Sequence, residues 1–199
     1  MTKIITISRQ FGSGGRTIGK EVADKLGIKC YDQEFIEKIS EETGLNANYI
    51  KEHAEQTSYK GWFADAFLAR DEKGLSNQDY IWLAQLEIIK KLAETESCVI
   101  VGRCADYILR DYPNVLKTFI HADEKFRAER IVNVYGETDE TPEKRLKDKD
   151  ERRASYYQRY TEMKFGEATN YHISLNSGAI GIEKCVDIIV DLYKSIPEE

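Results

Sequence analysis

Residues 10–17 read Q-F-G-S-G-G-R-T and combine three glycines with two hydroxyl side chains. Because glycine has no Cβ atom, Gly12, Gly14 and Gly15 permit positive φ angles and a close approach of the backbone to an anion, with Ser13 between them. Backbone N–H groups that face outward from such a turn are donors for phosphate oxygens. We therefore interpret this segment, called the glycine loop below, as a phosphate-binding loop.

A strand and a helix are expected on either side of the glycine loop. The β-branched run at residues 4–7 predicts a buried strand, and apolar residues recur with helical spacing over residues 18–26. The alternative is a glycine-rich connection that binds nothing. Strand, glycine turn and helix in this order favour phosphate binding, because the helix N-terminus then points at the anion.

The loop departs from the pattern G-x-x-x-x-G-K-[ST] at the lysine. If Gly15 is the second glycine, Arg16 takes the lysine position and Thr17 the hydroxyl position, while Gln10 stands where the first glycine is expected. If the loop is instead aligned on the G-S-G of nucleotide kinases, the lysine position holds Gly15. Arginine supplies the same charge with a different reach and geometry.

Composition limits the class of protein. The chain has 199 residues, of which 41% are hydrophobic and 32% charged, and its net charge is −6. This predicts one globular domain with insertions and gives no support to nucleic-acid binding, which a basic surface would accompany. The apolar runs are too short for a membrane helix, and a strand is expected at the first residues in place of a signal peptide, so we predict a cytoplasmic protein.

Metal binding by cysteine and histidine is not expected. The four cysteines show no C-x-x-C spacing, and the three histidines lie near none of them in the sequence. These residues are more typical of small core positions and ordinary polar positions.

Charged residues follow two further predicted strands. The strand at residues 28–31 ends at Asp32, and the strand Cys98–Val101 ends at Gly102 and Arg103. Ligands gather at the carboxyl ends of parallel strands, so Asp32 is expected near the glycine loop, although it could also cap the next helix. An arginine at the end of a buried strand is costly to desolvate without an anion, which favours a ligand phosphate near Arg103 over a fixed carboxylate.

The long segment between these two strands, residues 33–94, is predicted to be helical, with patterns at 34–43, 47–56 and 78–94. Residues 59–67 are unusually aromatic. They could pack within a helical insertion or form a wall for a stacked base, and the sequence does not decide between these alternatives.

A very polar helix is expected after Pro142, which suits a first helical turn. Arg152, Tyr156 and Arg159 fall on one face of it by their spacing. Because almost no apolar stripe is evident, the helix either stands in solvent or closes over a charged ligand as a lid.

The rest of the chain continues the alternation of strands and helices. We predict strands at 115–122 and 171–175, and helices at 124–135 and 182–193, with a turn at 176–178. Alternating strands and helices indicate an α/β fold with a parallel sheet and helices on both faces.

The complete set of motifs resembles the cytidylate kinase-like family of nucleoside monophosphate kinases. The segments that carry the resemblance read I-T-I-S-R-Q-F-G-S-G-G-R, V-I-V-G-R, D-K-D-E-R-R-A-S-Y-Y-Q-R-Y-T and N-Y-H-I-S-L-N-S-G. The resemblance implies a single P-loop kinase domain of three layers, with a five-stranded parallel sheet. It implies a core at residues 1–32, 95–135 and 170–199, a monophosphate-binding insertion at about 33–94 and a lid at about 136–162.

The resemblance also implies roles for residues on the donor side. Gly12 to Thr17 would hold the phosphates of ATP, with Mg²⁺ bound through those phosphates beside Thr17. Arg16 would act in catalysis, and Asn176 would lie near the donor base.

On the acceptor side, Asp32 and Arg103 would bind the substrate. Asp148 or Asp150 would be the carboxylate that orients the lid arginines or the acceptor sugar. Arg152 and Arg159 would hold the transferred phosphoryl group.

The activity that the resemblance implies is ATP-dependent phosphorylation of a nucleoside monophosphate, CMP or dCMP first. Two departures from cytidylate kinase itself are the missing loop lysine and Val101, where that enzyme has an aspartate before G-R. Two alternatives therefore stay open: a kinase of another small metabolite, and a nucleotide-binding regulator without turnover. The sequence does not predict the oligomeric state.

Overall fold

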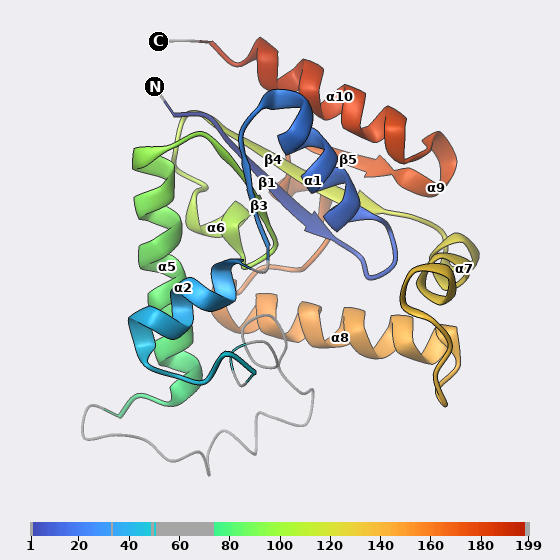
Figure 1. Cartoon of the computed structure of the whole chain (residues 1–199), viewed down its shortest axis with the longest axis horizontal. Helices are drawn as coiled ribbons and strands as arrows, with labels where there is room; N and C mark the ends of the chain where they lie inside the picture. The colour runs from blue at the N-terminus through green and yellow to red at the C-terminus, as the bar shows by residue number, and fades with distance from the viewer. Residues whose placement is uncertain (1, 33, 49, 51–73, 198–199) are drawn as a thin grey trace.

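Five parallel strands form one sheet at the centre of the molecule, in the order β2-β3-β1-β4-β5 (Figure 1). The computed structural model describes residues 2–32, 34–48, 50 and 74–197. The strands are β1 (Ile4–Arg9), β2 (Lys29–Tyr31), β3 (Cys98–Val101), β4 (Val115–His121) and β5 (Ile173–Asn176). The predicted five-stranded parallel sheet is confirmed; β3 has the predicted bounds, and the other four strands differ from the predicted ones by one or two residues at their ends.

Helices α1 (Gly15–Leu26) and α10 (Ile182–Ser195) cover one face of the sheet. Side chains alternate between the faces of a strand, and Ile5 and Ile7 of β1 pack with these two helices. Gly27 ends α1 in a left-handed conformation with a φ of 67°, which is the common way for a helix to terminate.

Helices α5 (Asn77–Thr95) and α6 (Ala105–Ile108) cover the opposite face, and α2 (Glu34–Thr43) packs against α5. Ile4 of β1 faces this side. A capping box between Ser76 and Asp79 fixes the start of α5. Both faces of the sheet are thus buried, as the continuous apolar strands predicted.

Two helices lie at the end of the sheet where β1 leads into the glycine loop: α7 (Glu124–Tyr135) and α8 (Pro142–Thr161). Asp123 caps α7, and Thr141 caps α8 ahead of Pro142. Helix α8 runs across this end of the molecule from α7 toward α5 (Figure 1). The remaining short helices are η1 (Ala168–Asn170) and α9 (Ser177–Ile180).

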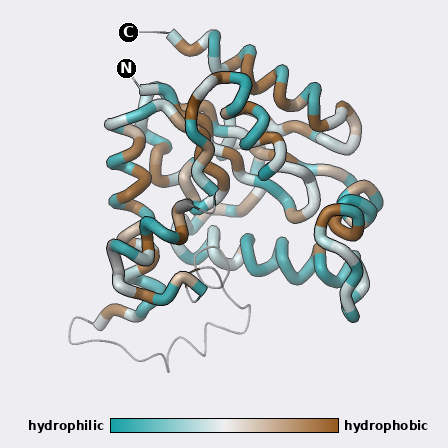
Figure 2. The backbone as a smooth tube through the Cα atoms, in the orientation of Figure 1, coloured by the Kyte–Doolittle hydropathy of each residue, from teal (hydrophilic) through white to brown (hydrophobic). Residues whose placement is uncertain are grey.

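The expectation that α8 has almost no apolar stripe is wrong. The helix is largely hydrophilic (Figure 2), yet Leu146, Tyr156, Tyr157 and Thr161 are buried. The two tyrosines pack with Cys104 and with partly buried aromatic side chains of neighbouring segments. Tyrosine has an apolar ring and a polar hydroxyl, so its burial is easily missed in a sequence that is otherwise charged.

Two further expectations differ from the structure or fall outside it. The predicted turn at 176–178 is instead the start of α9, which Asn176 caps by accepting hydrogen bonds from the amides of Gly178 and Ala179. The aromatic segment 59–67 and most of the predicted helix at 47–56 lie outside the described residues. In the described part of the chain, no helix is both long and apolar enough to span a bilayer.

Candidate active site

The glycine loop connects the end of β1 to the first turn of α1. Gly12 and Gly14 have φ angles of 80° and 82°, which side chains other than glycine rarely adopt. Gly14 is also the N-cap residue of α1 and has no side chain with which to satisfy the first helical amides. The start of α1 is therefore suited to an external anion.

The buried side of the glycine loop is fixed by two serines. Ser13 is fully buried, and its hydroxyl oxygen lies 2.9 Å from the carbonyl of Gln10 and 3.1 Å from that of Ile120. The hydroxyl of Ser177, which begins α9, donates to the carbonyl of Ser13 at 2.6 Å. These contacts tie the loop to β4 and α9, so its backbone geometry is set by strands and helices that follow much later in the chain.

The arginine at the lysine position of the loop is paired with the carboxylate that follows β2. Arg16 forms an ion pair with Asp32, and its Nη2 atom lies 3.4 Å from the Asp32 Oδ1 atom. The Arg16 side chain is 51% exposed. The structure thus joins these two predicted site residues to each other, across the gap between α1 and the end of β2.

A different arginine reaches the loop. Arg130 of α7 donates from Nη2 to the hydroxyl of Thr17 at 2.8 Å. Its Nε atom lies 3.2 Å from the position that a Cβ atom on Gly14 would occupy. A guanidinium group therefore covers the N-terminus of α1, where the helix dipole and the loop amides already favour negative charge.

A second contact between α7, α8 and the loop is built on a carboxylate. Asp150 of α8 accepts from the amide of Phe11 at 2.7 Å and from Nη1 of Arg127 at 2.6 Å. Arg127 also donates to the carbonyl of Phe11 at 3.1 Å, and Arg153 donates to the carbonyl of Arg9 at 3.3 Å. Of the two aspartates predicted in this region, the structure brings Asp150 to the loop, whereas Asp148 is half-buried elsewhere on α8.

The segment that joins β3 to α6, residues 102–104, is called the β3–α6 turn. Gly102, Arg103 and Cys104 have φ angles of 77°, 62° and 53° in succession. Left-handed conformations at residues other than glycine are strained and persist only where the surroundings hold them. Arg103 is only 6% exposed. This turn therefore keeps a buried arginine at the end of a central strand.

The remaining predicted site residues lie on α8 and at the start of α9. Arg159 reaches to within 4.0 Å of Asp79 on α5, and Arg152 is exposed on α8. The side chain of Asn176 is occupied in capping α9. The predicted lid residue Arg159 is thus seen in contact with α5.

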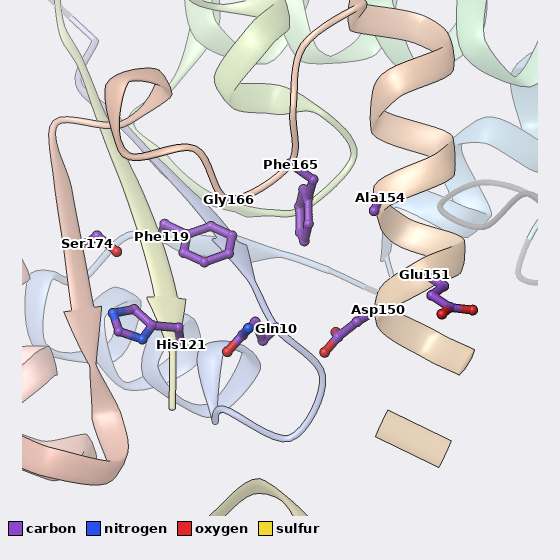
Figure 3. Close-up of a pocket in the computed structure, with 9 residues that line it drawn as sticks. All are labelled: Gln10, Phe119, His121, Asp150, Glu151, Ala154, Phe165, Gly166 and Ser174. Atoms are coloured by element: carbon purple, nitrogen blue, oxygen red, sulfur yellow. The ribbon is translucent and has the colours of Figure 1, made fainter. Parts of the chain in front are cut away.

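A cavity of about 490 Å³ lies between the glycine loop, the ends of β4 and β5, and α8 (Figure 3). Gln10, His121, Asp150 and Phe165 line it together with residues of β4, β5 and α8. Asp150 is thus shared between the cavity and the loop. The described residues contain no group of three or more histidines, cysteines or carboxylates that could hold a metal ion by themselves.

Sequence reasoning missed the role of α7. Arg127 and Arg130 were visible in the predicted helix at 124–135, but no function was assigned to them. Their i, i+3 spacing is a usable signal, because it places both side chains on one helical face. What was missing was the order of the sheet, since β4 lies directly beside β1 and α7 therefore begins next to the loop.

A β2-β3-β1-β4-β5 parallel sheet with a glycine loop between β1 and α1 is the fold of P-loop kinases. A model of the cytidylate kinase-like family matches residues 4–179. The chain belongs to the cytidylate kinase-like family. Among curated proteins, it is 27% identical over 190 residues to the cytidylate kinase of Archaeoglobus fulgidus, covering 94% of this chain and 92% of that one.

Solved structures show the same fold. An uncharacterized protein from Eubacterium ventriosum has a TM-score of 0.73 at 28% identity, with 98% of this chain and 99% of that chain covered. The shikimate kinase of Acinetobacter baumannii, in complex with shikimate, has a TM-score of 0.56 at 15% identity, with coverages of 100% and 97%. A gluconokinase from Sinorhizobium meliloti has a TM-score of 0.53 at 15% identity, with coverages of 96% and 94%. Family and fold together support kinase activity on a nucleotide or another small metabolite.

Proposed function

We propose that this protein transfers the γ-phosphoryl group of ATP to a nucleoside monophosphate, with CMP or dCMP as the first acceptors to test. The observation that carries the proposal is the guanidinium group of Arg130, 2.8 Å from the Thr17 hydroxyl at the start of α1. Helix amides, a loop of glycines and a guanidinium group together suit a polyphosphate. Membership of the family supports phosphotransferase activity. The identity of the acceptor is what we propose in addition.

The residues around the glycine loop fit ATP with Mg²⁺. The amides of Gly14 to Thr17 and the side chain of Arg130 would hold the donor phosphates. The Thr17 hydroxyl would exchange its contact with Arg130 for one ligand position on Mg²⁺, and phosphate oxygens would supply other ligands. When bound, Mg²⁺-ATP provides the phosphoryl group and part of the charge neutralisation that its transfer requires.

The chain's own residues act by position and charge. An acceptor phosphate is already ionised at neutral pH, so no general base is needed, and catalysis consists of alignment and electrostatic stabilisation. Arg103 would hold the acceptor phosphate beside the β3–α6 turn, with Asp32 on the same side. Arg152 and Arg159 would join after closure of the lid, for which Arg159 leaves Asp79.

The choice of CMP rests on the name of the curated relative and on the motifs that resemble its family. Val101, which is fully buried, stands where cytidylate kinase has an aspartate, and this departure favours testing other acceptors as well. A kinase of another small metabolite is the second candidate. A coupled assay for ADP separates the two, with CMP, dCMP, UMP and AMP in one set and phosphorylatable metabolites in the other.

The orientation of Arg16 favours a third candidate, a nucleotide-binding regulator without turnover, because the cation at the lysine position is held by Asp32. A thermal melt distinguishes this case. ATP would raise the melting temperature while no acceptor yields ADP. Turnover with CMP or dCMP supports the first proposal, and turnover only with another metabolite supports the second. We also propose that the protein is located in the cytoplasm.

A further inference from the structure

A buried carboxyl group joins three elements behind the candidate active site. Asp106, in the first turn of α6, is 2% exposed. Its Oδ1 atom accepts from the hydroxyl of Ser8 on β1 at 3.0 Å, and its Oδ2 atom accepts from the hydroxyl of Tyr157 on α8 at 2.7 Å. Each oxygen of one side chain is therefore bonded to a different part of the fold.

Each of these three residues lies close in sequence to the candidate active site. Ser8 precedes Gln10, the first residue of the glycine loop, by two positions. Asp106 follows Arg103 by three positions, and Tyr157 stands between Arg153 and Arg159 on α8. A small displacement at Asp106 would therefore move the loop, the β3–α6 turn and the α8 arginines relative to one another.

The backbone of the β3–α6 turn requires such support. The Gly102 amide donates to the carbonyl of Ile7 at 3.0 Å, and the Ala105 amide donates to that of Gly102 at 3.1 Å. These bonds fix the two ends of the turn, while the strained φ angles lie at Arg103 and Cys104 between them. Strained residues persist where surrounding contacts hold them, and the bonds of Asp106 hold the segment that follows.

The electrostatics favour a fixed arrangement. Burial raises the pKa of Asp106, and the hydrogen bonds from Tyr157 and Ser8 oppose that rise. Burial, together with the neighbouring carboxyl group, holds the pKa of Tyr157 far above its usual value, so Tyr157 remains a hydrogen-bond donor at physiological pH. A buried carboxyl group costs stability that an apolar side chain would not, which points to a need for a defined geometry.

We propose that Asp106 is a positioning residue. By accepting hydrogen bonds from the hydroxyls of Ser8 and Tyr157, it keeps Arg103 and the C-terminal half of α8 in a fixed place relative to the glycine loop. The inference rests on the proposed phosphoryl transfer, in which Arg103 holds the acceptor. Asp106 itself touches no substrate. It acts through the β3–α6 turn and through α8.

The chain offers a matched control in Tyr156, the residue that precedes Tyr157 on α8. Tyr156 is as buried as Tyr157, at 3% exposed, and its hydroxyl accepts from Nε2 of Gln85 on α5 at 3.0 Å. Phenylalanine at either position removes one buried hydrogen bond and keeps the ring. Of the two variants, only Tyr157→Phe removes a hydrogen bond to Asp106 of α6, the helix that directly follows the β3–α6 turn.

The first experiment compares Tyr157→Phe with Tyr156→Phe in steady-state kinetics, using the acceptor that gives turnover. We expect similar losses of melting temperature from both variants. Tyr157→Phe should lower kcat/KM for the acceptor about tenfold, the equivalent of one lost hydrogen bond, with the KM for ATP within twofold. Tyr156→Phe loses only the bond to Gln85 and keeps its ring against Cys104, so its effect on kcat/KM for the acceptor should be clearly smaller. Equal kinetic effects from the two variants would overturn the inference.

Rescue by a conservative variant separates positioning from charge. Asp106→Asn keeps the shape and can still accept one hydroxyl and donate to the other, so we expect at least half of the activity to remain. Asp106→Ala should lose at least as much as Tyr157→Phe. In an Arg103→Ala background, the effect of Tyr157→Phe should shrink, because coupled residues are not additive. Full additivity contradicts a role through Arg103.

Hydrogen–deuterium exchange tests the role of Asp106 without requiring turnover. Hydrogen–deuterium exchange of the amides in residues 102–108 should accelerate in Tyr157→Phe and stay unchanged in Tyr156→Phe. If the unmodified protein phosphorylates no acceptor, the proposed function fails, and the exchange experiment still decides whether Asp106 holds the turn. Unchanged exchange in both variants overturns the positioning role even in an active kinase.

Discussion

The glycine loop and the β3–α6 turn follow neighbouring strands, and both contain positive φ angles, but they use different residues for them. In the loop, Gly12 and Gly14 adopt these angles without steric cost. In the turn, Arg103 and Cys104 do so at a cost of about 1–3 kcal/mol each. Glycine gives the loop its shape but no charge, so the loop takes its cation from α7, whereas the turn keeps its own arginine.

The two regions are therefore sensitive to different substitutions. The loop depends on close backbone packing and on a side chain from another element. The turn depends on contacts that hold a strained backbone, such as those of Asp106. Substitutions at the two regions should therefore affect different ligands.

The largest effect is expected from Gly15→Ala. A Cβ atom there would lie 2.6 Å from the Cβ atom of Arg9, which is part of a buried strand and cannot simply rotate away. We expect the loop to shift and ATP binding to fall by at least about 100-fold, the consequence of misplacing phosphate donors by an ångström. Isothermal titration with ATP measures this loss.

Gly27→Ala is the matched control for that variant. Gly27 directly follows α1 and has a φ of 67°, but a Cβ atom there would meet nothing within 4 Å. It should lose about 1 kcal/mol of stability and bind ATP as before. Normal ATP binding by Gly15→Ala would contradict the role of the loop backbone.

The next effect is expected from Arg130→Ala. A charge-assisted hydrogen bond contributes about 1.5–3 kcal/mol, so ATP affinity should fall about 10- to 100-fold while acceptor affinity changes little. Arg110→Ala, an exposed arginine beyond α6, removes the same charge and should have no effect on ATP. If Arg16→Ala weakens ATP binding more than Arg130→Ala does, the loop's main cation has been misassigned.

Arg103→Ala should act on the other substrate. We expect the KM for the acceptor to rise about tenfold, as for one charged hydrogen bond, and the KM for ATP to stay within twofold. Arg103→Lys should recover part of the loss, since it restores the charge without the guanidinium fork. A rise in the KM for ATP alone would place Arg103 on the donor side and end the contrast between the two regions.

The smallest effect is expected from Asp32→Asn, which releases Arg16. Partly exposed ion pairs contribute about 0–1 kcal/mol, so stability should barely change. ATP affinity should rise about twofold, because the loop gains a nearby cation, while the KM for the acceptor increases if Asp32 binds it. A drop in ATP affinity would show that the Arg16 and Asp32 pair supports the donor site.

Much of this arrangement was predictable because it is local. The β-branched runs predicted the strands of the sheet, and Asp32 and Arg103 could be assigned to strand ends from their position after those runs. Pro142 marked the start of α8 correctly. The burial of Tyr156 and Tyr157 was missed, because a stripe of tyrosines within a charged helix has no clear apolar period.

Which residue each arginine contacts was not predictable from the sequence. Arg16, Arg127, Arg130 and Arg153 were all visible as cations, and nothing local says that Arg16 pairs with Asp32 while Arg130 covers Thr17. That choice follows from the sheet order, in which β4 and α7 lie on one side of the loop and β2 lies beyond β3 on the other.

The sequence alone therefore determined the alternation of strands and helices, the positions where glycine permits a phosphate-binding turn, and the family. The first two properties depend on residues close together in the sequence, whereas the family is identified from motifs spread along residues 4–179. The packed structure was needed to show which arginine contacts the loop, how Asp106 joins β1, α6 and α8, and that α8 is anchored at its C-terminal half. Ser8 and Asp106 are 98 positions apart in the sequence, and Thr17 and Arg130 are 113 positions apart. Such contacts form only when the packed sheet brings distant side chains together.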